Sequence, residues 1–247
     1  MSSTKSLKKL TPEATIDQII TADKNVASLL NSIGMKPELY QDQTLRSVCL
    51  QRQWNEEELL KWIKKNRKNE ECIKSEPQKH SFGEDVTGWC RWLATTIQPC
   101  ITDLLDDIES DLPRVQLVHG NQYIWLKDIE WHFLKLKKQT DRYFFLEEET
   151  LYPLAIELND QRESILYGKV KDLSRSLEIV EGDYPIILKE MEIIEKFSEG
   201  FKNPEGACST LRIMNKNLAD LSTQLKKYFS IEQKQLFPLI RHQLQFS

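Results

Sequence analysis

The sequence contains little glycine or proline and no long apolar run. Only 8 of its 247 residues are Gly and 9 are Pro, too few for the many tight turns of an all-β fold, whereas 29% are charged. No stretch of about 18 apolar residues occurs, and the opening MSSTKSLKKLTPE lacks the apolar core of a secretory signal. We therefore expect a helical, cytoplasmic protein that makes no membrane contact.

Positive charge is also scarce. The formal net charge is -4, and the short basic runs at residues 5–9 and 61–68 are typical of solvated helix surface, so no nucleic-acid partner is predicted. The five cysteines form no Cys-x-x-Cys pair, which argues against a zinc finger or a disulfide framework and predicts reduced thiols. No phosphate-binding glycine loop, G-x-S-x-G turn or H-E-x-x-H segment is present. The sequence thus shows no catalytic residues and favours a non-enzymatic role, without deciding whether the chain is an enzyme.

Residues 12–68 carry signals for several short helices. Thr15 and Gln18 have the spacing of a capping box, in which each side chain satisfies a free N–H of the first helical turn. Gly34 can close a helix in the left-handed conformation, and Asn55 can start the next one. These signals predict a small helical domain over residues 12–68.

The helical pattern changes after a charged stretch that contains Pro and Gly. We assign residues 69–83 to a linker and residues 84–247 to a four-helix bundle, because short connections favour antiparallel neighbours. The four long helices are expected at residues 85–109, 122–158, 164–201 with a break at 181–185, and 211–239. The fold class predicted for the whole chain is all-α.

One segment occurs twice in the bundle region. Residues 143–154, YFFLEEETLYPL, match residues 228–239, YFSIEQKQLFPL, in the pattern Y-F-x-x-E-x-x-x-L-[YF]-P-L. In each copy the Tyr, the Glu four residues later and the Leu four beyond lie on one apolar helix face. Glu147 and Glu232 are costly on that face unless they meet a metal, a cation or several hydrogen-bond donors. Two such carboxylates hold metal pairs in helical bundles where histidines accompany them, but here each is accompanied by a tyrosine.

The repeat carries a resemblance to a known family. Together with Val118-His119-Gly120 and with residues 204–211, PEGACSTL, it resembles the RIC family (repair of iron centres, YtfE/ScdA type) over residues 14–240. The resemblance implies a small N-terminal helical domain with a Cys-Cys pair, followed by an antiparallel hemerythrin-like four-helix bundle. It also implies a non-haem di-iron site, held by a His-x-x-x-Glu-x-x-x-Leu-Phe-Pro motif on each of two helices and by one histidine from each of the others. The function implied is repair of iron–sulfur clusters damaged by nitric oxide or oxidants.

The chain departs from the family at its metal ligands. Tyr143 and Tyr228 stand at the two motif histidines, whereas Glu147 and Glu232 match the motif carboxylates, and the other two helices contain no histidine at all. Imidazole is a neutral ligand well suited to iron, but a phenol must first lose a proton whose pKa is near ~10. We therefore expect no di-iron site and predict no cofactor.

The chain also departs from the family at the thiol pair. Aligning Gly34 with the glycine of the family's Gly-x-x-x-Cys-Cys stretch places Glu38 and Leu39 at the two cysteines. Both chemical signatures of the family are thus replaced, while the helical pattern remains.

Two interpretations of the repeat carboxylates stay open. Glu147 and Glu232 could share a weakly bound iron or manganese ion with a third carboxylate, such as Glu190 or Glu192. Alternatively they are a vestige of the ancestral site, protonated or hydrogen-bonded to tyrosine hydroxyls and to a cation such as Arg91. Burial and mutual proximity raise carboxyl pKa values, which favours a shared proton.

The resemblance and the departures together lead to a functional hypothesis. The chain is interpreted as a degenerate iron–sulfur cluster repair protein that acts through protein–protein interaction or regulation in nitrosative or oxidative stress. The expected partner is an active relative, an iron–sulfur client protein or a regulator. One alternative is active stress repair through a weak carboxylate-rich iron or manganese site. Another is self-association as a homodimer, because members of the family often form dimers.

Overall fold

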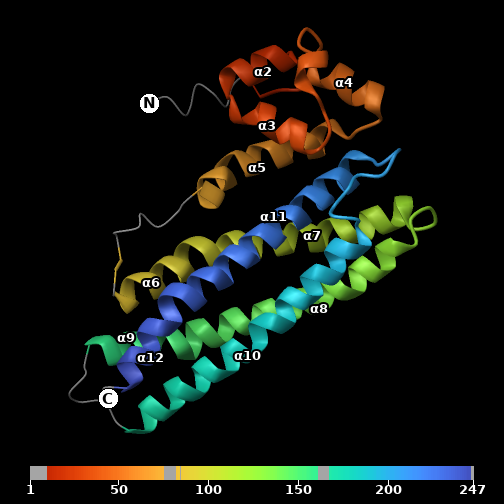
Figure 1. Cartoon of the computed structure of the whole chain (residues 1–247). Coiled ribbons are helices and arrows are strands. Elements are labelled where there is room, and N and C mark those ends of the chain that lie inside the picture. The colour runs from red at the N-terminus through yellow and green to blue at the C-terminus, as the bar shows by residue number, and fades with distance from the viewer. Residues whose placement is uncertain (1–9, 75–81, 84, 161–166, 246–247) are drawn as a thin grey trace.

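The chain folds into helices throughout the described part of a computed structural model, which covers residues 10–74, 82–83, 85–160 and 167–245 (Figure 1). Within these ranges no β-strand is formed, and extended backbone pairs only as an isolated bridge of Thr15 with Thr44. The all-α prediction is therefore confirmed. None of the helices in these ranges combines the length and the apolar character required to span a bilayer.

Short helices build the N-terminal unit. They are α2 (Ile16–Ala22), α3 (Asn25–Ser32), η1 (Pro37–Leu39), α4 (Leu45–Arg52) and the longer α5 (Glu56–Lys74). The capping box is present, because Gln18 N–H donates to Thr15 Oγ1 and Thr15 N–H donates to Gln18 Oε1, both at 3.2 Å. Gly34, which follows α3, has a φ of 81°, and Asn55 Oδ1 accepts from Glu57 N–H at 3.0 Å at the start of α5. The signals for the start and end of these helices are thus read correctly from sequence.

The N-terminal unit has an apolar core of its own, built from its helices and the segment before them. Ile16, Leu30 and Leu59 are fully buried in it, and Ile213 of the bundle also belongs to it. Helix α5 continues through Lys74, so it enters the stretch at 69–83 that is predicted as a linker. The rest of that stretch lies outside the described residues, except for residues 82–83.

Four rods of helix form the bundle (Figure 1). They are α6 (Val86–Trp92), η2 (Leu93–Ile97) and α7 (Gln98–His119); α8 (Trp125–Leu146), η3 (Glu147–Leu151) and α9 (Tyr152–Asp160); α10 (Tyr167–Phe197); and α11 (Ser209–Ile231), η4 (Glu232–Leu236) and α12 (Phe237–Gln245). Rod α8 packs mainly on α10, and α7 packs mainly on α11. One continuous apolar core runs through all four rods.

Two predicted helix ends are wrong. The first rod extends to His119 rather than to residue 109, so the Val-His-Gly signal marks the end of this helix itself. The break predicted at 181–185 is absent, and α10 passes through Pro185 as one helix. Val180 and Ile187 on either side are fully buried, and this packing overrides the local cost of a proline inside a helix.

Three π-helical turns interrupt the rods, and each is followed by a proline. In η2, η3 and η4 the residue after the turn bonds back five positions: Gln98 N–H to Leu93 O, Tyr152 N–H to Glu147 O, and Phe237 N–H to Glu232 O. Pro99, Pro153 and Pro238 come next in the chain. A proline has no N–H and its ring clashes with the carbonyl four residues before it, so a turn with one extra residue accommodates it inside a helix.

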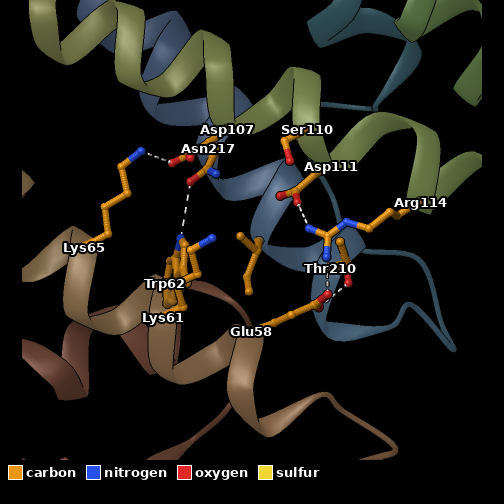
Figure 2. A pocket seen from close by; sticks show the side chains of 11 residues that line it. Glu58, Lys61, Trp62, Lys65, Asp107, Ser110, Asp111, Arg114, Thr210 and Asn217 are labelled. Atoms are coloured by element: carbon orange, nitrogen blue, oxygen red, sulfur yellow. Dashed lines mark hydrogen bonds and ion pairs between the residues drawn. The ribbon is translucent and has the colours of Figure 1, made fainter.

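The N-terminal unit docks on the bundle through α5, which faces α7 and α11 (Figure 2). Trp62 Nε1 donates to Asn217 Oδ1 at 3.3 Å, and Lys65 Nζ lies 2.7 Å from Asp107 Oδ2. These contacts surround a pocket of about 130 Å³. We call this contact region the seam.

One arginine links the three helices at the seam. Arg114 on α7 forms ion pairs with Asp111 on the same helix and with Glu58 on α5, and Thr210 Oγ1 on α11 donates to Glu58 Oε2 at 2.7 Å. Asp111 is largely buried, and burial raises its carboxyl pKa to about 6 although Arg114 lowers it. The seam therefore compensates its buried acidic groups with guanidinium charge and hydrogen bonds.

The prediction of reduced cysteines is wrong at Cys100. Cys100 on α7 is disulfide-bonded, whereas Cys49, Cys90 and Cys208 are free. A disulfide requires two Cα atoms within about 7 Å, which depends on how the helices pack rather than on spacing along the chain. The sequence therefore contains no local signal for this bond.

Candidate functional site

The two carboxyl groups of the repeat meet in the middle of the bundle core. Glu147 begins η3 and Glu232 begins η4, and neither has any solvent exposure. Tyr143 hydroxyl donates to Glu232 Oε2 at 2.6 Å, and Tyr228 hydroxyl donates to Glu147 Oε2. Each tyrosine thus donates a hydrogen bond to the carboxyl group in the other copy of the repeat. We call Glu147 and Glu232 the buried pair.

Gln98 and Tyr152 complete the site. Gln98 Nε2 donates to Glu147 Oε2 at 2.9 Å and to the Tyr228 hydroxyl at 2.9 Å. The Tyr152 hydroxyl lies 2.8 Å from the Tyr228 hydroxyl and 3.3 Å from Glu232 Oε1. The first rod therefore contributes an amide, the second a carboxyl and two phenols, and the fourth a carboxyl and a phenol.

Sequence reasoning misses Gln98 and Tyr152 because regular helical spacing places other residues at the site. In an α-helix the residue four positions after Glu147, Leu151, shares its face. The π turn η3 contains an extra residue, so Tyr152, five positions after Glu147, also faces the buried pair. Gln98 occupies the equivalent position after η2. The proline that directly follows each of these residues is the signal that could have identified them.

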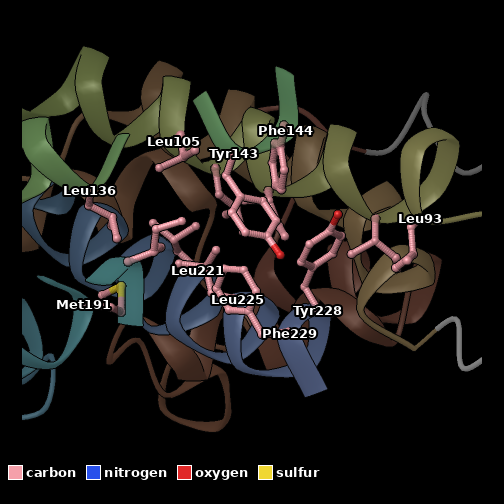
Figure 3. Packing of buried hydrophobic residues seen from close by; sticks show 14 of the residues in the cluster. Leu93, Leu105, Leu136, Tyr143, Phe144, Met191, Leu221, Leu225, Tyr228 and Phe229 are labelled. Carbon is pink, nitrogen blue, oxygen red and sulfur yellow. The ribbon is translucent and has the colours of Figure 1, made fainter. Parts of the chain in front are cut away.

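Aromatic rings surround the site and keep it apolar (Figure 3). Figure 3 shows the hydroxyl groups of Tyr143 and Tyr228 inside the bundle, among packed apolar side chains. The Tyr143 ring packs edge-on against Phe229, and the Tyr228 ring edge-on against Phe144, each with centroids 5.3 Å apart. Cys90 is buried nearby, where desolvation and the buried pair raise the pKa of its thiol. The thiol is therefore held in its protonated form, which is not the nucleophile.

Burial controls the protonation of this site. Desolvation, followed by the charge of Glu232, raises the pKa of Glu147 well above its ordinary value. Desolvation also raises the pKa of Glu232, while hydrogen bonds from Glu147 and from the tyrosines lower it. The pKa values of Tyr143, Tyr152 and Tyr228 are raised well above the ordinary value, mainly by desolvation. The phenols are therefore neutral donors.

The raised pKa values favour retention of a proton by the buried pair. Within the described residues, no Lys or Arg nitrogen lies within 4 Å of either carboxyl group, so no cation balances their charge. Glu147 Oε1 is buried and has no hydrogen-bond partner among the described residues. With one proton retained, the site carries a single negative charge among phenol and amide donors.

Several residues proposed from sequence lie away from the buried pair. Glu190 Oε2 is 2.5 Å from His132 Nδ1, where α8 and α10 pack together, and Glu192 is exposed. Neither provides the third carboxylate considered for a metal ion. Arg91 is also exposed, and Gln98 takes the place proposed for it beside the buried pair. Burial explains this exchange, because an amide donates hydrogen bonds at a lower desolvation cost than a guanidinium.

The positions aligned with the family's cysteine pair face solvent. Glu38 is exposed on η1, and the Leu39 side chain is 65% exposed. His119 is buried at the end of α7, and its Nε2 accepts from Cys208 N–H at 3.4 Å. These residues form no cluster with the buried pair.

The donor set of the site does not fit the di-iron centre that the resemblance implies. All of its donor atoms are oxygens or an amide nitrogen that already donates twice, and none of the described histidines contacts it. Among the described residues, no group of three or more His, Cys, Asp or Glu side chains is arranged to hold a metal. A pair of irons held by four imidazoles and two carboxylates therefore has no counterpart in this bundle.

Comparison with known proteins places the chain among distant relatives. It is 21% identical over 125 residues to the protein named iron-sulfur cluster repair protein YtfE of Yersinia pseudotuberculosis serotype IB, covering 51% of this chain and 52% of that protein. It is 20% identical over 125 residues, with the same coverage, to the protein of that name from Yersinia pestis strain Pestoides F. The chain thus spans about half the length of the curated relatives it matches. No family model matches it.

Proposed function

We propose that this chain is a degenerate relative of the iron–sulfur cluster repair proteins that binds no di-iron centre and acts by protein–protein interaction or regulation in nitrosative or oxidative stress. The observation that carries the proposal is the buried pair, whose carboxyl groups are hydrogen-bonded by phenols and an amide where the family resemblance implies imidazole-ligated iron. The names of the distant relatives support the connection to iron–sulfur cluster repair.

Iron loading tests the loss of the metal centre. The purified chain is incubated anaerobically with ferrous iron, desalted and analysed for iron per chain. We expect well under one iron per chain and no recovery of activity when the chain is added to an iron–sulfur enzyme damaged by nitric oxide. Two irons per chain, or recovery of the damaged enzyme, would overturn the proposal.

An exposed apolar stripe on α8 supports a binding role. Ile124, Trp131 and Leu134 share one helix face and are 74%, 62% and 47% exposed. Among the described residues, Lys127 and Lys138 beside the stripe have no carboxylate within 4 Å. An apolar stripe flanked by unbalanced lysines fits a partner with an apolar surface and acidic neighbours.

Substitutions on this stripe test the binding role. A chain with Trp131→Ser and Leu134→Ser should lose at least ten-fold in capture of its partner from stressed cells, with the fold unchanged by circular dichroism. The matched control is Leu50→Ser, which removes a leucine from the N-terminal unit that is even more exposed than Leu134. The partner recovered by the wild-type chain must in turn recover the chain in the reverse experiment, and equal capture by both variants contradicts the assignment of the stripe.

One observation favours an alternative with a single hard cation. Gln98 Oε1 and Glu147 Oε1 are both buried without a hydrogen-bond donor among the described residues, and carboxylate and amide oxygens suit manganese. In this alternative the chain takes part in stress repair through a weak carboxylate-rich site. Titration with manganous ion separates the two functions: binding that Glu147→Gln abolishes supports the alternative, and no saturable binding supports the leading proposal.

A further inference from the structure

Two arginines at the boundary between the N-terminal unit and the bundle have no acidic partner in the part of the chain that the structure describes. Arg52 ends α4, and Arg212 lies in the first turn of α11. Four other arginines, Arg46, Arg114, Arg142 and Arg241, each lie within 4 Å of a carboxylate. Within the described residues, no carboxylate oxygen comes that close to Arg52 or Arg212, although both are partly buried.

Neighbouring carbonyl groups and aromatic rings hold the two guanidinium groups. Arg52 Nη1 donates to Gly34 O at 3.2 Å, and Arg212 Nη1 donates to Ile33 O at 3.4 Å, so the two side chains bond consecutive carbonyl groups. Both guanidinium carbons lie over the Trp54 ring, at 5.0 Å and 5.7 Å from its centroid. Gly34 leaves room for this approach, because a Cβ on it would lie 2.9 Å from Arg212 Nη1. The two positive charges are thus fixed close together.

Among the described residues, the positive charges of Arg52 and Arg212 are not balanced by nearby negative charge. Burial, followed by the charge of Arg52, lowers the pKa of Arg212. Arg52 Nε is buried and donates to no acceptor in the described part of the chain, and a hydrogen bond from Arg52 Nη2 to the Tyr40 hydroxyl at 3.1 Å adds no charge. Two desolvated cations with spare N–H groups are unfavourable until an anion accepts from them.

We propose that Arg52 and Arg212 form a binding site for a doubly charged oxyanion of the phosphate type. A dianion balances both guanidinium charges, and its oxygens accept from the N–H groups that the carbonyl oxygens leave free. Because Arg52 belongs to the N-terminal unit and Arg212 to the bundle, the bound anion replaces repulsion between the two units by attraction. This proposal is independent of the function assigned to the buried pair.

Calorimetric titration of the full chain with inorganic phosphate, at constant ionic strength kept by chloride, tests the site. We expect saturable binding of one phosphate per chain and at least ten-fold weaker binding of acetate, which carries a single charge. Arg52→Gln and Arg212→Gln should each weaken phosphate binding at least ten-fold. Arg142→Gln removes the same charge from a paired arginine on α8 and should leave binding unchanged.

A spectroscopic measurement on the wild-type chain removes the dependence on how well the variants fold. Phosphate should shift the indole N–H resonance of Trp54, assigned with Trp54→Phe, and leave that of the exposed Trp131 in place. Phosphate should also raise the midpoint of thermal unfolding, because a ligand of the folded state stabilises it. No saturable binding, equal affinity for acetate, or equal weakening by Arg142→Gln and Arg212→Gln would overturn the proposal.

Discussion

The protein contains two buried acidic sites that are stabilised in different ways. At the seam, Asp111 and Glu58 are both paired with Arg114, so one cation beside solvent offsets part of their negative charge. In the bundle core, Glu147 and Glu232 meet phenols and an amide, with no cation within 4 Å among the described residues. The same functional group therefore lies beside a guanidinium in one place, and in the other burial raises its pKa and favours its protonated form.

The difference between the two sites follows from how deeply each is buried. A guanidinium is costly to desolvate completely, whereas the seam leaves the Arg114 side chain 51% exposed and allows the pair to form. A fully buried carboxyl group that lacks a cation reaches lower free energy by retaining its proton, which is why the pKa of Glu147 is raised. The stability contributed by the core should thus depend mainly on pH and on the hydrogen-bond donors around the buried pair. The stability contributed by the seam should depend on pH and on salt concentration.

Replacing both core carboxyl groups by amides gives the largest expected effect. Because the folded-state pKa values of the buried pair are raised, the folded chain keeps protons that the unfolded chain releases. Stability from this source is complete below the unfolded pKa near ~4.3 and is lost as pH rises through the folded pKa, at up to about 1.4 kcal/mol per pH unit for each proton. The variant Glu147→Gln/Glu232→Gln should keep its full stability at pH 8 and lose this pH dependence.

Urea unfolding at several pH values between 5 and 9 measures this effect. The matched control is Glu148→Gln/Glu149→Gln, which changes two exposed glutamates of the same rod and should retain the wild-type pH dependence. A severe loss of stability in the double core variant at pH 7 would contradict the shared proton.

Removal of one phenol is expected to have the next largest effect. Tyr143→Phe deletes the donor to Glu232 Oε2 without changing the packing, and the unsatisfied carboxyl oxygen should cost about 1–3 kcal/mol in the free energy of unfolding. In the Glu147→Gln/Glu232→Gln background the same substitution should cost less, because no charge is left to stabilise. Tyr184→Phe provides the control, since Tyr184 packs near Phe229 outside the hydrogen-bond network of the buried pair. Equal costs of Tyr143→Phe in the two backgrounds would show that the phenol does not stabilise a charge.

Asp111→Asn tests the seam at lower pH. The folded-state pKa of Asp111 is about 6, so the folded chain holds a proton on this side chain more tightly than the unfolded chain does. The resulting stabilisation of the folded state is complete below pH ~4 and is lost as the pH rises to about 6. The stability of Asp111→Asn relative to wild type should therefore increase by about 1–3 kcal/mol between pH 4 and 7 and then stay constant. Thermal unfolding across this range checks the change, with Asp103→Asn on the exposed side of α7 as the control. A difference that does not vary with pH would show that Arg114 balances Asp111 completely.

The ion pair between Lys65 and Asp107 should give the smallest effect. Its side chains are 34% and 32% exposed, and such pairs contribute about 0.2–1 kcal/mol that salt screens. Lys65→Met should therefore lower stability slightly at low salt and leave it unchanged at 1 M sodium chloride. The penalty for Tyr143→Phe should persist at high salt, because the core is not reached by ions. If the destabilisation by Tyr143→Phe also disappeared at 1 M sodium chloride, the core and the seam would not differ in their response to salt.

Much of the fold follows from local signals in the chain. The capping box of Thr15, the left-handed Gly34 and the apolar stripe of the last long helix each depend on residues within a few turns of one another. The continuous α10 does not follow from them, because burial of Val180 and Ile187 overrides the local preference around Pro185. Local capping signals are thus predictable from sequence, whereas the continuity of a long helix through a proline is not.

The candidate site likewise contains residues that the sequence predicts and residues that it does not. Glu147 and Glu232 could be identified by their places in a repeat on an apolar helix face, since helical periodicity alone places them there. Gln98 and Tyr152 could not, because π turns rotate them toward the buried pair. The crossed pairing of Tyr143 with Glu232 and of Tyr228 with Glu147 depends on how two rods face each other.

The sequence by itself determined that this protein is helical, that two carboxyl groups are buried at equivalent places in a repeat, and that the histidines expected beside them are replaced. These properties follow from residue identity and from a helical period of about 3.6 residues. Only the tertiary structure decided that both carboxyl groups are fully desolvated with raised pKa values, that Gln98 rather than Arg91 donates to Glu147, and that Arg52 and Arg212 lie together with no carboxylate within 4 Å among the described residues. These outcomes depend on desolvation and on contacts between distant segments, and packing of the helices sets both.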